Sequence, residues 1–67
     1  MDDAAIAAAA ARFLRSAGVS AQRELEKAVR RALASGAVAE GETLTAGLTL
    51  SNDKLALDVT IYAKLEL

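Results

Sequence analysis

Two different periods of apolar residues divide the chain into a helical half and a strand half. Over the first 35 residues apolar side chains recur every three or four positions, which is the spacing of an amphipathic helix. From Thr43 onward they alternate with polar residues, which is the spacing of a strand with one apolar face. The pattern therefore predicts an α+β fold in which helices precede strands.

The helical half is predicted to form two helices. The first spans about residues 3–16, with Asp2 or Asp3 as its N-terminal cap and Gly18 after its end. Its apolar stripe consists of Ile6, Ala9, Ala10, Phe13, Leu14 and Ala17. The second spans about residues 21–35, with Ser20 as its cap and Gly36 at its end. Its apolar stripe consists of Leu25, Ala28, Val29, Ala32 and Leu33.

The segment 16–20 between these helices is similar to the turn of a DNA-binding helix-turn-helix, because a glycine is followed by a small apolar residue. In that motif the sixth residue after the glycine is buried. Here that residue is the charged Glu24, and the apolar Leu25 comes one position later. The spacing therefore favours an ordinary corner between two helices.

The strand half is predicted to form one β-hairpin after a loop over residues 37–42. If Asn52 and Asp53 form a two-residue turn, every facing pair on one side of the hairpin is apolar. A longer loop is the alternative, because Asn-Asp is a weaker turn pair than Asn-Gly. The predicted pairs are Leu50 with Leu55, Leu48 with Leu57, Ala46 with Val59, and Leu44 with Ile61. A slip of one residue would place leucines opposite threonines, so the pattern predicts this register.

In this register the second strand is longer than the first. Ala63, Leu65 and Leu67 extend beyond the start of the first strand and face residues 38–42. A two-stranded sheet is marginal in water, and its open edges accept further strands. We expect a homodimer in which two hairpins join edge to edge into a four-stranded antiparallel sheet, with the helices packed on one face (ααββ). The alternative is that residues 38–42 pair with the overhang within one chain.

Length and composition favour the dimer. A chain of 67 residues is expected to form a single domain, residues 1–67, with a thin core. It contains no cysteine and no histidine, so neither disulfides nor the usual zinc ligands can stabilise it. Hydrophobic residues make up 54% of the chain and the net charge is −1, which is the composition of a folded protein. Oligomerisation is a common way for so small a chain to enlarge its core.

The alanine-rich N-terminal segment is not predicted to target or anchor the chain. A secretory signal has a basic start, whereas this segment begins with Asp2 and Asp3. Arg12 interrupts the apolar run well before the ~20 residues that a membrane span needs. We therefore expect a cytoplasmic protein with no membrane partner.

Basic residues are concentrated in the helical half. They are Arg12, Arg15, Arg23, Lys27, Arg30 and Arg31. The last four lie opposite the apolar stripe of the second predicted helix, so they could contact the phosphates of a nucleic acid. They are also what the solvated face of an amphipathic helix contains, and Glu26 with Arg30 forms a stabilising pair four residues apart. The solvated face is favoured, nucleic-acid binding is the alternative, and an acidic protein partner is a third.

No catalytic, cofactor or metal site is predicted. Histidine and cysteine, the usual general base and thiol nucleophile, are both absent. The acidic pairs Asp2–Asp3 and Glu40–Glu42 are typical of helix capping and loop solvation, and no glycine run precedes a helix as in a phosphate-binding loop. The threonines and Tyr62 on the second face of the hairpin could form a contact surface. The sequence thus predicts a non-enzymatic interaction module whose protein partner it does not identify.

Several short motifs resemble those of a family of short bacterial proteins of unknown function. They are Arg12-Phe13-Leu14, Gly18-Val19, the run from Gln22 to Val29 (QRELEKAV), and Gly41-Glu42-Thr43-Leu44. The resemblance covers most of the chain and rests on residues 12–44. It implies a compact cytoplasmic bacterial protein and transfers no active site.

Overall fold

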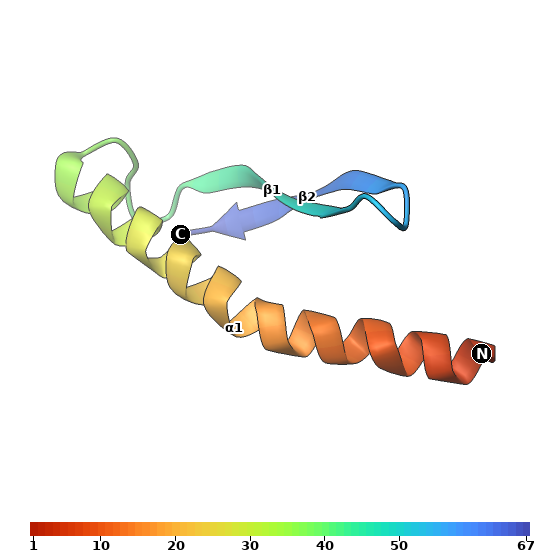
Figure 1. The fold of residues 1–67 in the computed structure, drawn as a ribbon. Helices are drawn as coiled ribbons and strands as arrows, with labels where there is room; N and C mark the ends of the chain where they lie inside the picture. The colour runs from red at the N-terminus through yellow and green to blue at the C-terminus, as the bar shows by residue number, and fades with distance from the viewer. The chain divides into compact units, whose positions relative to one another are not determined.

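The computed structural model describes all 67 residues and contains one helix and two strands. Helix α1 spans Asp3–Ser35, strand β1 spans Thr43–Asn52, and strand β2 spans Leu57–Glu66 (Figure 1). The chain divides into two units, the helical unit Met1–Ala37 and the hairpin unit Val38–Leu67. The α+β class is therefore confirmed, and each unit is described in turn.

The helical unit is a single helix, so the prediction of two helices is wrong. Residues 16–20 continue α1 without a corner, and Ser20 is an interior residue and not a cap. Gly18 costs about 1 kcal/mol relative to alanine in a helix interior, which propagation through the residues on both sides can outweigh. With only one helix, the predicted layer of two helices on the sheet, and with it the ααββ layout, is also wrong.

Both ends of α1 are capped as the sequence predicts. The carboxylate of Asp2 accepts a hydrogen bond of 2.8 Å from the backbone N–H of Ala5, and Asp3 adds negative charge to the first turn. Gly36 adopts a left-handed conformation with φ of 81°, and its N–H donates to the carbonyls of Ala32 and Leu33. A hydrogen bond of 2.9 Å from Ala37 N–H to the Ala32 carbonyl completes the C-terminal cap.

The hairpin unit begins with a short ordered loop that leads into β1. The Glu42 carboxylate accepts a hydrogen bond of 3.0 Å from Ala39 N–H, and the Glu42 N–H donates to the Ala39 carbonyl at 3.1 Å. Gly41 lies between them with φ of 83°, a conformation that favours glycine. The predicted loop over residues 37–42 and the start of β1 at Thr43 are confirmed.

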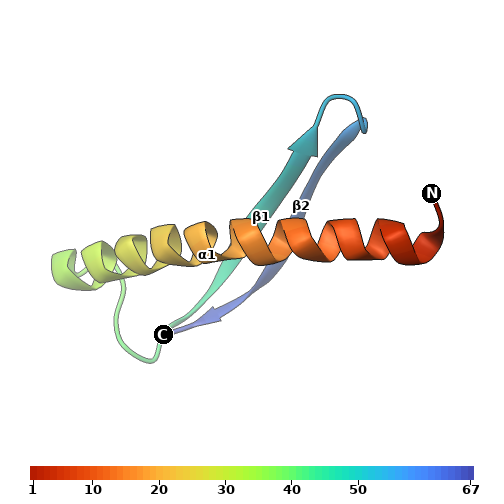
Figure 2. The same cartoon turned by 60° about the horizontal axis from the view of Figure 1, so that its bottom comes forward.

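The two strands pair antiparallel along their whole length (Figure 2). Their register is four residues away from the predicted one. On one face the pairs are Leu44 with Leu65, Ala46 with Ala63, Leu48 with Ile61, and Leu50 with Val59. Apolar residues still face apolar residues, because a shift by an even number keeps each side chain on the same face. The predicted overhang is therefore absent, and residues 38–42 do not pair with it as a strand.

The turn explains the difference in register. The predicted two-residue turn at Asn52 and Asp53 is wrong, because Asn52 belongs to β1 and the loop comprises residues 53–56. The Asn52 side-chain carbonyl accepts a hydrogen bond of 3.0 Å from Leu55 N–H, and Ala56 N–H donates to the Asp53 carbonyl at 3.1 Å. Ala56 then takes a positive φ of 50° to rejoin β2. The asparagine side chain thus stabilises a longer turn than the sequence spacing suggested.

Candidate interaction surfaces

The continuous helix joins the two predicted apolar stripes into one, which we call the helix stripe. Its members are Ile6, Ala10, Leu14, Ala17, Ala21, Leu25, Ala28 and Ala32. Successive members from Leu14 are three, four and four residues apart, and the pattern repeats at Leu25, which is 25 − 14 = 11 residues later. An 11-residue repeat keeps one face of a helix in register with a neighbouring helix in a right-handed supercoil. This 11-residue repeat is present in the sequence, but it is recognised only when residues on both sides of Gly18 are treated as one helix.

The helix stripe is uncovered in the helical unit. No residue of the chain is buried, and Ile6 and Leu14 are 52% and 49% exposed. Phe13, which the sequence analysis included in the first apolar stripe, lies on the margin of the helix stripe and is 60% exposed. A contiguous apolar surface on an exposed helix is typical of an interaction site.

The hairpin has a second uncovered apolar surface, which we call the hairpin apolar face. Its members are Leu44, Ala46, Leu48, Leu50, Leu57, Val59, Ile61, Ala63, Leu65 and Leu67. Ala63 and Leu65, predicted as dimer contacts in an overhang, are paired with Ala46 and Leu44 within the chain. Leu67 N–H donates a hydrogen bond of 2.9 Å to the Glu42 carbonyl. The predicted facing partners Glu42, Glu40 and Val38 are therefore wrong for Ala63 and Leu65. Their contact with a second copy stays a prediction, now as members of this face.

The opposite face of the hairpin is formed mainly by hydroxyl side chains. Thr49 and Thr60 face each other with their Oγ1 atoms 2.9 Å apart, in hydrogen-bond distance. One step along, Tyr62 faces Gly47, and its ring lies close to the glycine Cα. Tyr62 is 71% exposed, so this face combines a threonine pair with an accessible aromatic ring.

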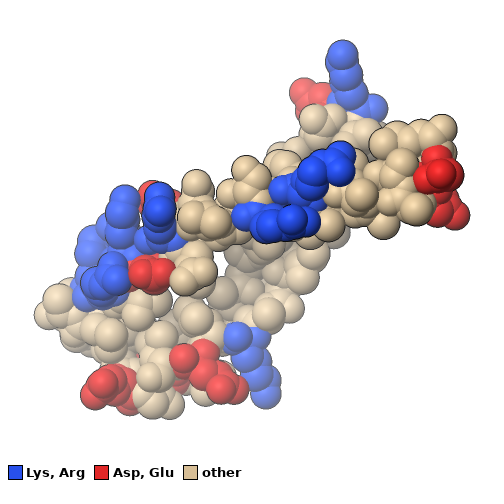
Figure 3. All heavy atoms as spheres, turned by 90° about the horizontal axis from the view of Figure 1, so that it is seen from below, with Lys and Arg blue, Asp and Glu red and all other residues tan.

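All six predicted basic residues lie on α1, where the single helix aligns some of them. Arg12, Arg23 and Arg30 are separated by 11 and 7 residues, which places them on one side of the helix. Two of the cations are paired with acids, Lys27 Nζ with Glu24 at 3.4 Å and Arg30 with Glu26 at 3.1 Å. These groups are well exposed and interleave with acidic side chains (Figure 3).

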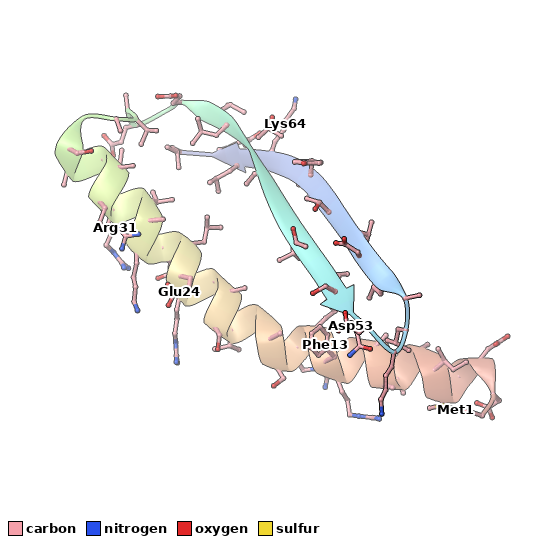
Figure 4. All side chains as sticks on the ribbon, turned by 45° about the horizontal axis from the view of Figure 1, so that its top comes forward. Met1, Phe13, Glu24, Arg31, Asp53 and Lys64 are labelled. Atoms are coloured by element: carbon pink, nitrogen blue, oxygen red, sulfur yellow. The ribbon has the colours of Figure 1, made fainter.

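No deep cleft accompanies the basic residues. Arg12, Arg15 and Ser16 line a shallow hollow on the surface of α1. Arg31 and Glu24 project outward from the helix (Figure 4). The arrangement matches the solvated side of an amphipathic helix, with ion pairs that contribute a few tenths of a kcal/mol each.

The structure contains no group of three or more acidic, histidine or cysteine residues that could hold a metal ion. Although α1 is 33 residues long, none of its stretches is apolar enough to cross a bilayer.

A family model covers the whole chain, residues 1–67, and describes proteins whose function is not established. Neither the curated proteins nor the solved structures contain a significant match to the chain.

Proposed function

The chain belongs to the family of unknown function DUF6494, and on this premise we propose that it is a non-enzymatic interaction module that assembles with a second copy of itself. The observation that carries the proposal is that no residue is buried in either unit, although each unit has a continuous apolar surface. Folding is driven mainly by the removal of apolar surface from water. A second copy supplies that cover for the helix stripe and for the hairpin apolar face.

The helical unit needs a partner for its stability. Helices in proteins gain most of their stability from the packing of an apolar face against another element, and less from intrinsic propensity. The helix stripe from Ile6 to Ala32 extends about 40 Å at 1.5 Å per residue. A strand of ten residues extends only about 33 Å. The hairpin is thus too short to cover the stripe from end to end, whereas another copy of α1 has the required length and the same 11-residue repeat.

The hairpin unit supports the same proposal. A two-stranded hairpin is marginally stable at best, and three or more strands or a packed helix are needed for independent stability. Leu48 and Ile61, facing each other at the middle of the hairpin apolar face, are 49% and 52% exposed. A homodimer can stabilise both units at once, since each copy offers the other an apolar helix face and an open strand edge.

A non-enzymatic role is part of the proposal. The chain has no histidine and no cysteine, and its acidic side chains are distributed over helix α1, the loops and strand β2, most of them exposed. Such groups lack the enclosed surroundings in which catalytic acids, bases and nucleophiles are tuned. A cytoplasmic location is also part of the proposal.

Nucleic-acid binding is the alternative function, and one observation favours it. The continuous helix aligns Arg12, Arg23 and Arg30 over about 27 Å, a span over which cations can follow a phosphate backbone. Arg30 is however paired with Glu26, and the chain as a whole carries a net charge of −1. The assembly proposal is therefore the stronger of the two.

Sedimentation equilibrium tests the proposal directly. We expect a mass of about twice 6.9 kDa at micromolar concentration, and dissociation on dilution accompanied by loss of the helical circular dichroism signal. The variant Leu65→Lys, which places a charge on the hairpin apolar face, should lower both the melting temperature and the dimer fraction. A folded monomer of 6.9 kDa at every concentration would contradict the proposal.

A further inference from the structure

The sheet has two open edges, and the register identifies the backbone groups at each. Leu67 N–H bonds to the Glu42 carbonyl, so the next pair but one, Leu44 with Leu65, and every second pair after it exchange hydrogen bonds between the strands. The intervening residues direct their N–H and C=O groups away from the hairpin. On β1 these outward residues are Thr43, Thr45, Gly47, Thr49 and Ser51, and on β2 they are Asp58, Thr60, Tyr62, Lys64 and Glu66.

The two edges differ in charge. From Thr43 to Asn52, β1 contains no charged residue and no proline. Three of the five outward residues of β2 are charged, namely Asp58, Lys64 and Glu66. Charged side chains on an edge strand are a common protection against pairing with another strand, and an uncharged edge lacks that protection.

We infer that β1 is the edge through which two copies of the chain join, by antiparallel pairing of β1 with β1 of the second copy. The inference rests on the proposed self-association and specifies the surface that carries it. The product is a four-stranded antiparallel sheet with β1 of each copy at its centre and the charged β2 strands at its two outer edges. Two symmetric edges of this kind close into a dimer and leave no further β1 edge free.

The sequence of β1 is complementary to itself in one register. With Gly47 opposite Gly47 of the second copy, the outward residues meet each other, as the new hydrogen bonds require. The side-chain pairs are then Thr43 with Ser51 and Thr45 with Thr49 on the hydroxyl face, and Leu44 with Leu50 and Ala46 with Leu48 on the apolar face. Like side chains meet on both faces, and the hairpin apolar faces of the two copies become one surface.

The β2 edge is less suited to the same role. Self-pairing centred on Tyr62 places Asp58 opposite Glu66 of the second copy, which is destabilising because like charges face each other. Only a shorter register, centred on Ile61, brings Asp58 opposite Lys64. That register pairs residues 57–65 of the two copies and leaves charged side chains in the contact between the two β2 strands.

A matched pair of proline variants tests the edge. Thr49 and Thr60 face each other, so Thr49→Pro and Thr60→Pro remove the same hydroxyl contact and neither removes a hydrogen bond between β1 and β2. Each removes one outward N–H, from the β1 edge and from the β2 edge respectively. We expect Thr49→Pro to raise the dimer dissociation constant about tenfold or more, because one bond is lost per copy, and Thr60→Pro to leave it nearly unchanged.

Amide hydrogen exchange of the unmodified protein provides a second measurement that does not depend on a variant folding. The N–H groups of Thr45, Gly47 and Thr49 should exchange slowly in the dimer and rapidly on dilution. Those of Thr60, Tyr62 and Lys64 should exchange rapidly throughout.

The outcomes separate this inference from the proposed function. A dimer that Thr60→Pro dissociates and Thr49→Pro does not, or whose β2 amides are the protected ones, would overturn the β1 edge and leave self-association standing. A dimer in which both edges exchange rapidly would assign the contact to other surfaces and also overturn it. A monomeric wild-type chain would overturn the proposed function itself.

Discussion

The ring of Tyr62 occupies the space that a side chain at Gly47 would fill. A Cβ atom at Gly47 would lie 3.0 Å from Tyr62 Cε1 and 3.1 Å from Thr60 Cγ2. The two residues face each other in a pair without backbone hydrogen bonds, where side chains approach most closely. Glycine weakens a strand interior, and the aromatic ring across the strand offsets part of that loss by covering the bare backbone.

Gly47→Ala is therefore expected to destabilise the hairpin, by about 1 kcal/mol, because the added methyl group displaces the Tyr62 ring and presses on Thr60. Thermal unfolding followed by circular dichroism measures the change. Gly47→Ala in a Tyr62→Ala background should lower the stability less, since the Tyr62 ring that the added methyl group would meet has been removed. Equal costs in the two backgrounds would show that the ring does not occupy this position.

Gly18→Ala should stabilise the protein by about 1 kcal/mol. Gly18 lies inside α1 with no atom within 4 Å of an added Cβ, so alanine gains helix propensity at no steric cost. Gly36→Ala is the control, because its surroundings are equally open but its φ is +81°. That substitution should destabilise by about 1 kcal/mol. If Gly18→Ala lowered the melting temperature instead, the helix would have to be interrupted at residue 18.

Removing the N-terminal cap should shorten the helix from its first turn. Asp2→Ala eliminates the 2.8 Å hydrogen bond to Ala5 N–H and is expected to cost about 1 kcal/mol of helix stability. Asp2→Asn keeps an acceptor oxygen and should cost much less. Carbon chemical shifts of residues 4–7 measure helicity at this end. A similar loss in Asp3→Ala and Asp2→Ala would argue that only the charge matters.

The hairpin turn should tolerate glycine at its last position. Ala56 has a positive φ of 50°, which is unfavourable for a residue with a Cβ atom. Ala56→Gly removes this strain and should raise the stability of the hairpin by up to about 1 kcal/mol, less the extra chain entropy of glycine. Ala56→Val should lower it, since a β-branched residue fits this conformation poorly. Denaturant titration of both variants tests the order.

The basic residues of α1 are expected not to bind duplex DNA or heparin at about 50 mM salt, because ion pairs and a net charge of −1 reduce their attraction for phosphate. Retention on a heparin column at that salt would contradict this. If retention occurred, Arg12→Gln combined with Arg23→Gln should abolish it, whereas Arg31→Gln, about 100° away from Arg12 around the helix, should have little effect.

The sequence alone predicted the ends of the helix and the start of β1, because each depends on one residue and its nearest backbone groups. The cap at Asp2, the left-handed Gly36 and the start of β1 at Thr43 were all predicted from residue type and position. The two faces of the hairpin followed from the alternation of apolar residues, because the side of a strand on which a residue lies depends only on whether its number is odd or even.

The register of the hairpin and the continuity of the helix were decided by the structure. An alternating pattern is unchanged by a shift of two or four residues, so it determines the faces but cannot choose between pairing Leu44 with Ile61 and pairing it with Leu65. The choice depends on the four-residue turn that Asn52 closes. The free energy cost of a glycine such as Gly18 is likewise too small to end a helix unless a capping residue or a competing contact ends it there. Only the structure shows that α1 continues through Gly18.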